Sequence, residues 1–193
     1  MIAIEINTKQ LKELREAAGK AKKSFTKELA AAINETAKNH RMRQGRNIRS
    51  VVNLKKKQIE SSIKITKATS VTPQARVFLL ETYREGLQHF GAKQNKRGVS
   101  YKIGKTKGRG MVIGAFMGPS PGQLAPKLYG GVFKRVGKER LPIIKLYGVS
   151  PYGAYEKNDF ETIDVAFSAD YLKGQIERRI KLNVLRANGL VSK

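Results

Sequence analysis

The residues best suited to chemistry in this sequence are basic ones, and they gather in two stretches that contain no acidic residue. Besides Lys38, the first stretch contains Arg41, Arg43, Arg46, Arg49, Lys55, Lys56 and Lys57. The second contains Lys93, Lys96, Arg97, Lys102, Lys105, Lys107 and Arg109. Such clusters bind phosphate groups through charge alone, and this binding weakens as salt rises.

Two interpretations of these stretches stay open. They contact either the backbone of a nucleic acid or an acidic protein partner, because both present dense negative charge. Sequence-specific reading is not favoured, since the chain shows no helix-turn-helix, zinc-finger or aromatic ribonucleoprotein motif. The simplest alternative is a solvent-exposed surface with salt bridges. Such a surface normally carries acidic as well as basic residues, and these two stretches carry no acid.

The sequence gives little support for a catalytic site or a metal-binding site. The two histidines, His40 and His89, lie 49 positions apart, and no carboxylate accompanies either at ligand spacing. A nuclease that uses acids such as Glu81 and Glu85 is a distant third reading, because no metal-binding cluster supports it. We therefore expect no enzyme, no metal and no cofactor.

The segment "GVSYKIGKT" resembles a phosphate-binding P-loop but departs from it in two ways. The motif places its two glycines five positions apart, whereas Gly98 and Gly104 are six apart. A P-loop must also open a helix, and the following "KGRGMVIGAF" is typical of a strand. Nucleotide binding is therefore not expected.

The composition and the net charge indicate what kind of protein this is. The chain of 193 residues has 39 Lys and Arg against 15 Asp and Glu, giving a formal charge of +24. Such a field attracts polyanions and repels other copies of the chain, so the isolated protein should be monomeric or weakly associated. Forty per cent of the residues are apolar, enough for a core. There is no cysteine, no secretory signal pattern and no apolar run long enough to span a membrane, so no membrane partner is expected.

The pattern of elements predicts an α+β fold in a single domain with a helical arm. Residues 1–62 form a helical and basic N-terminal region, with helices expected at 8–19 and 21–40 and a basic helix or arm that breaks at Gly45. The stripe of the second helix consists of Phe25, Leu29, Ile33 and Ala37.

Residues 63–148 predict one antiparallel sheet, running from about Arg76 to Tyr147 and packed by the Phe25–Ala37 helix and the C-terminal helix. Strands are expected at 75–80, at 99–103, and at 111–117, where "MVIGAFM" favours a strand covered on both faces. "VFKRV" and "LPIIKLY" predict a hairpin whose apolar residues pack the sheet. Residues 149–193 predict a long helix that Asn158 caps.

Four segments, taken in order, resemble the minor tail protein Z family of lambda-like bacteriophages. They are "ELAAAINETAKNHRMRQGR", "IKITKAT" with "PQARVFL", "IGAFM" and "VFKRVGKERLPIIKLYGVS". The resemblance implies a structural virion protein with no catalytic set, a minor tail or tail completion component at the head-proximal end of the tail. It also implies tail or neck proteins as partners, a sixfold ring on the tail, help in positioning the genome end, and assembly in the host cytoplasm.

A second reading from another class stays open. The charge alone also fits a host-type basic nucleic-acid-binding protein without sequence specificity. The two readings differ in assembly: the first predicts docking on a tail or head connector, the second tight binding to free nucleic acid with no structural partner.

Overall fold

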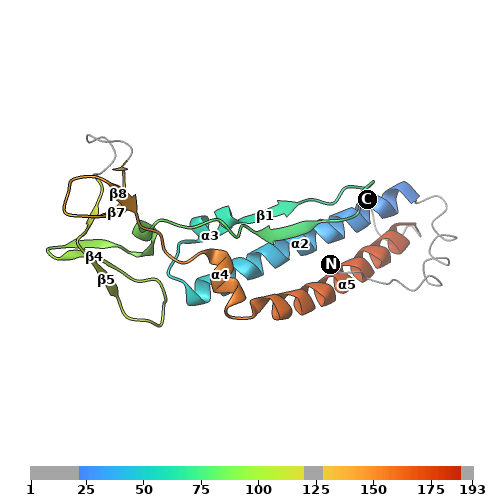
Figure 1. The fold of residues 1–193 in the computed structure, drawn as a ribbon. Coiled ribbons are helices and arrows are strands. Elements are labelled where there is room, and N and C mark those ends of the chain that lie inside the picture. Colours follow the sequence, from blue (N-terminus) through green and yellow to red (C-terminus); the bar gives the residue numbers. More distant parts are fainter. Residues whose placement is uncertain (1–21, 120–127, 188–193) are drawn as a thin grey trace. The chain divides into compact units, whose positions relative to one another are not determined.

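In a computed structural model, the structure describes residues 22–119 and 128–187 (Figure 1). Helices stand at both ends of this sequence and short antiparallel strands lie between them, so the predicted α+β class is confirmed. The helix expected at 8–19 and residues 120–127 lie outside the described residues. The described residues form two compact units.

The elements follow one another along the chain in a simple order. The helices are α2 (Lys22–Val51), α3 (Lys56–Ser62), the 3-10 helix η1 (Leu87–Phe90), α4 (Pro151–Glu156) and α5 (Phe160–Ala187). The strands are β1 (Ile63–Thr66), β2 (Arg76–Leu79), β3 (Lys93–Asn95), β4 (Gly98–Tyr101), β5 (Gly110–Ile113), β6 (Ala115–Met117), β7 (Val132–Arg135) and β8 (Ile143–Lys145). They form three small sheets, β1-β2, β3-β4-β5 and β6-β7-β8, so the expectation of one sheet was wrong.

Unit 1 consists of residues 22–39, 65–76 and 166–187, and its main feature is the packing of α2 against α5. Arg179 on α5 donates to Glu28 on α2 at 2.6 Å and to Glu35 at 2.8 Å. The buried side chains on this part of α2 include Ala30 and Ala32, whose small size lets two helices approach closely.

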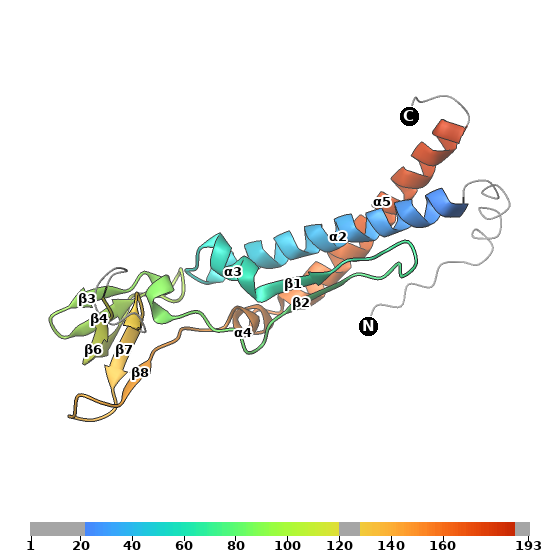
Figure 2. The same cartoon turned by 90° about the horizontal axis from the view of Figure 1, so that it is seen from above.

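Unit 2 consists of residues 40–64 and 77–165. Its largest fully buried core side chains are Ile48, Ile59, Ile63, Phe90, Val99 and Val132. Its two three-stranded sheets lie next to each other, and the Met117 N–H donates to Gln94 Oε1 at 2.8 Å (Figure 2). The last turns of α2 supply the core of unit 2, which corrects the expectation that the Phe25–Ala37 segment packs these strands.

The segment "MVIGAFM" differs from its prediction. It forms two strands, β5 and β6, separated by Gly114, whose φ of 72° glycine adopts without strain. Met111 and Ile113 on β5 are exposed, so this strand is not covered on both faces. The predicted hairpin is confirmed: β7 and β8 pair antiparallel with Phe133 opposite Lys145.

Two helix boundaries also differ from the prediction. Helix α2 continues through Gly45 to Val51, so the predicted break is absent. Helix α5 begins at Phe160, and the residue before it, Asp159, accepts a bond from the Thr162 hydroxyl at 3.2 Å. Asn158 instead donates to the Ala154 carbonyl at 2.7 Å, so it is not the cap.

Candidate nucleic-acid or acidic-partner interface

The structure joins the two basic stretches at the end of α2. The Asn53 N–H donates to the Ile103 carbonyl at 2.7 Å, and the Asn53 side chain donates to the Lys102 carbonyl at 3.0 Å. The Lys105 N–H donates to the Val51 carbonyl at 3.1 Å. These bonds hold the loop between β4 and β5 against the residues that follow α2, so the two stretches form one region of unit 2.

Four exposed cations stand on either side of this junction, and we call them the basic surface: Arg46, Arg49, Lys105 and Lys107. The two arginines lie three residues apart, on one side of α2. None of the four is in an ion pair among the residues that the structure describes. Their charge is therefore available to an anionic partner.

Arg41 and Arg43 instead contact other residues of unit 2. Arg41 donates to the Glu60 carbonyl at 3.1 Å, which joins α2 to α3. Arg43 Nε lies 3.1 Å from Asp164 Oδ1, and that carboxylate is fully buried. Arg43 is therefore engaged within unit 2, unlike the exposed Arg46 and Arg49 of the same stretch.

The other predicted residues have separate places on unit 2. Lys55, Lys56 and Lys57 are exposed at the start of α3, where Lys56 pairs with Glu60 at 3.5 Å. Lys93, Lys96 and Arg97 are exposed on β3 and the turn into β4, whereas Lys102 is half-buried. Arg109 is exposed but donates to the Gly91 carbonyl at 2.7 Å and to the Ser100 carbonyl at 3.2 Å.

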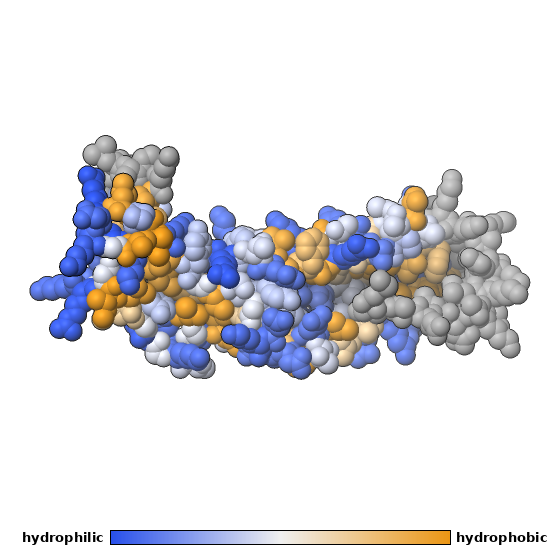
Figure 3. Space-filling model, in the orientation of Figure 1, coloured by the Kyte–Doolittle hydropathy of each residue, from blue (hydrophilic) through white to orange (hydrophobic). Residues whose placement is uncertain are grey.

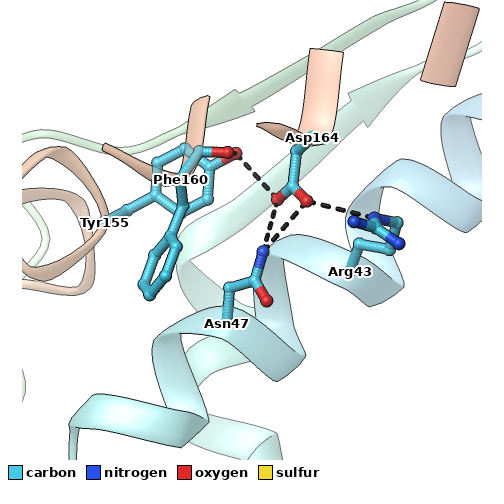
Figure 4. A network of polar contacts seen from close by, with 5 residues as sticks. All are labelled: Arg43, Asn47, Tyr155, Phe160 and Asp164. Atoms are coloured by element: carbon cyan, nitrogen blue, oxygen red, sulfur yellow. Dashed lines mark hydrogen bonds and ion pairs between the residues drawn. The ribbon is translucent and has the colours of Figure 1, made fainter. Parts of the chain in front are cut away.

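A buried polar network holds the end of α2 within unit 2 (Figure 4). Asp164 of α5 accepts from Arg43 at 3.1 Å, from Asn47 Nδ2 at 2.9 Å and from the Tyr155 hydroxyl at 2.9 Å. Burial, together with the hydrogen bond to this carboxylate, raises the pKa of Tyr155. Asn47 and Arg43 alternate with the exposed Arg46 and Arg49 along α2, so the network positions the basic surface.

Sequence reasoning missed this network. Nothing in the local sequence distinguishes Asp164 from the other acids near the start of α5. The partner Arg43 lies 121 residues away in the chain.

Both ring nitrogens of His89 have partners within unit 2. His89 lies 3.4 Å from Glu85 and 3.2 Å from Gln58, and Glu85 also accepts from the Tyr83 hydroxyl. Among the described residues, no group of three or more histidine, cysteine or acidic side chains is arranged to hold a metal ion. No helix in the described part of the chain is long and apolar enough to cross a membrane.

His40 predicts a pH dependence of stability. Burial lowers its pKa from the ordinary value of 6.5, against the opposing attraction of Asp164 and with the support of Arg43. The unfolded chain therefore takes up this proton at a higher pH than the folded chain does. We expect the free energy of unfolding to fall as pH drops below about 6.5.

Replacing His40 with glutamine should flatten this decline, measured by urea unfolding at about pH 7.5 and about pH 5.5. His89→Gln is the matched control, because it removes the other histidine and leaves the His40 environment unchanged. A parent protein whose stability does not change over this interval would contradict the prediction.

Comparisons of the chain with protein-family models, with curated proteins and with solved structures gave no match.

Proposed function

We propose that this chain is a structural component of a phage tail, a minor tail or tail completion protein at the head-proximal end. In this role its basic surface contacts the backbone of the genomic DNA while the genome end is positioned for delivery. The ordered resemblance to the tail protein family supports the class of protein. The junction of the two acid-free stretches at Asn53 supports the DNA contact and is the observation that carries it.

Fixed charge without an ion-pair partner among the described residues favours DNA as the ligand of the basic surface. Main-chain hydrogen bonds set the spacing between α2 and the loop that follows β4, so little ordering is needed when phosphates bind. None of the four residues of the basic surface is aromatic, so the surface offers no aromatic ring on which bases could stack. Binding through such cations is independent of base sequence and sensitive to salt.

Assembly follows from the same charge. With a formal charge of +24, copies of the chain repel one another until a counter-charged partner or DNA is present. We therefore propose that the chain is monomeric or weakly associated in solution. It forms a ring, sixfold as in the family, only on the tail, together with tail or neck proteins.

The first test changes all four residues of the basic surface to glutamine: Arg46→Gln, Arg49→Gln, Lys105→Gln and Lys107→Gln. Duplex DNA affinity should fall equally for unrelated sequences, and the salt slope should decrease by about 0.9 per lost phosphate contact. Fluorescence anisotropy at several salt concentrations measures both. The matched control removes four exposed cations elsewhere: Lys27, Lys64, Lys67 and Arg76.

An equal loss in the control would mean that net charge alone governs binding, and the basic surface would have no special part. In a phage, the variant should still be incorporated into tails but should deliver DNA poorly. If the protein is missing from purified tails while its affinity for free DNA is unchanged, the basic surface binds a neighbouring protein instead. Tight DNA binding without any docking on tails would favour the host-type nucleic-acid-binding protein.

A further inference from the structure

The hairpin formed by β7 and β8 carries exposed aliphatic residues beyond the core of unit 2. Val136 is 63% exposed, Leu141 68% and Ile144 48%. The prediction that the apolar residues of this hairpin pack the sheet therefore holds for Val132 and Phe133, which are buried, and is wrong for these three. We call residues 134–145 the hairpin tip.

The strand register places two of these aliphatic residues, Val136 and Ile144, on one face of the hairpin. Lys134 lies opposite Ile144, and the Val136 N–H donates to the Pro142 carbonyl at 3.1 Å, which extends the ladder by one pair. Side chains two positions apart on a strand share a face, so Val136 lies on the same face as Val132, which is fully buried. This face thus runs from the buried Val132 through the exposed Lys134 to Val136, with Ile144 opposite Lys134, and its outer part is left uncovered by the described residues.

Bases outnumber acids in the hairpin tip. The hairpin tip has one acid, Glu139, and five bases: Lys134, Arg135, Lys138, Arg140 and Lys145. Among the described residues none of these bases is in an ion pair, and the Arg135 guanidinium lies over the Phe116 ring at 5.2 Å. Figure 3 shows hydrophobic residues gathered over the strands of unit 2, with hydrophilic residues beside them.

We propose that the hairpin tip is a docking surface for another protein, whose complementary face has an apolar centre and acidic residues around it. Exposed apolar residues with a polar rim are typical of protein interaction sites. Lys134 on this face, with Lys138 and Arg140 in the loop between the strands, specifies the sign of the partner's charge. This interaction is separate from the DNA contact of the basic surface and does not depend on it.

Other occupants fit the hairpin tip less well. A second copy of the chain would bring its own charge of +24 against these bases. DNA would satisfy the bases, but its phosphate backbone offers no apolar surface to the three aliphatic side chains, whereas a protein face can offer both. A membrane anchor needs more buried apolar area than three short side chains provide.

The test uses a synthetic copolymer of glutamate and tyrosine as a probe, compared with polyglutamate of equal charge. The full chain should bind the copolymer about tenfold more tightly, because only the copolymer offers apolar surface to the aliphatic residues. The variant Val136→Ser, Leu141→Ser, Ile144→Thr should lose this difference and keep its affinity for polyglutamate. Calorimetry measures the affinities, and circular dichroism checks that each variant is folded.

The matched control changes three aliphatic residues exposed elsewhere, Met42→Gln, Val71→Ser and Val184→Gln, and should bind the copolymer like the parent. If the triple variant does not fold, Leu141→Ser alone replaces it, because Leu141 lies in the loop between the strands.

Several outcomes would overturn the proposal. These are an unchanged copolymer affinity in the hairpin variant, an equal loss in the control, and self-association that depends on the hairpin. Hairpin-dependent binding to vesicles of phosphatidylglycerol, without any preference for the copolymer, would assign the surface to membranes instead.

Duplex DNA affinity should be reduced by less than twofold in the hairpin variant. A larger loss would make the hairpin tip part of the DNA contact, whereas failure of the basic surface to bind DNA would leave the docking proposal standing.

Discussion

Replacing Asp164 with alanine should lower the free energy of unfolding by about 3–5 kcal/mol, the range found when one partner of a buried charge pair is removed. The carboxylate is fully buried, and it accepts hydrogen bonds from Arg43, Asn47 and Tyr155. Without it, the partly buried Arg43 guanidinium, the Asn47 amide and the buried Tyr155 hydroxyl all lose this acceptor. Urea unfolding followed by circular dichroism measures the change.

The control is Asp170→Ala, the same substitution at an exposed position of the same helix, which should change stability by no more than about 0.5 kcal/mol. Asp164→Asn keeps the shape and one acceptor oxygen, so it should fall between the two. An Asp164→Ala variant within about 1 kcal/mol of the parent would show that the network contributes little. Because Asn47 lies beside the basic surface, the alanine variant should also bind DNA more weakly.

Replacing Gly98 with alanine should destabilise the chain by about 3 kcal/mol. Gly98 lies at the start of β4 with a φ of 154°, a conformation that other residues rarely adopt. A Cβ there would overlap the Val112 carbonyl oxygen and approach Ile113 Cα to 3.0 Å. Both obstacles are backbone atoms of the neighbouring strand β5, so no side-chain rotation removes the clash and the two strands must separate.

Gly108→Ala is the matched control, because a Cβ at that position in the loop between β4 and β5 has nothing within 4 Å. This control should unfold like the parent and keep its DNA affinity. Loss of stability in both variants would mean that the loop itself requires glycine. No loss in Gly98→Ala would show that β4 and β5 adjust to the added methyl group.

The sequence predicted those features that depend on short-range patterns. The helix that contains Phe25 and Ala37 follows from its apolar spacing, and the hairpin at 132–145 follows from two apolar runs joined by a turn. The bases of the candidate interface were also identified in this way, since the absence of acids is visible within a single stretch. None of these inferences requires knowledge of contacts distant in the chain.

Features that depend on distant contacts were missed. A break was predicted at Gly45, because glycine disfavours a helix by about 1 kcal/mol. The fully buried Ile48 and the bonds from Asn47 to Asp164 hold the next turns of α2 in place. Asn47 and Asp164 lie 117 residues apart, so no local pattern reveals their contact.

The same reason explains the two errors about exposure. An apolar run indicates that a strand favours burial, but it does not say whether any element covers the strand. Ile113 and Ile144 have the sequence character of core residues, yet they are 68% and 48% exposed. Likewise, composition alone did not reveal that Arg43 pairs inside the fold while Arg46 remains exposed.

The two units are interleaved along the chain, and this limits how gene segments that encode them can be exchanged by recombination. The described residues of unit 1 come from three stretches and those of unit 2 from two, and both α2 and α5 contribute to both units. A single recombination breakpoint within the described residues therefore cannot transfer one unit intact and leave the other whole. Exchange between related genes should preserve function only when the breakpoints lie outside this block, so the two units are expected to evolve together as one heritable module.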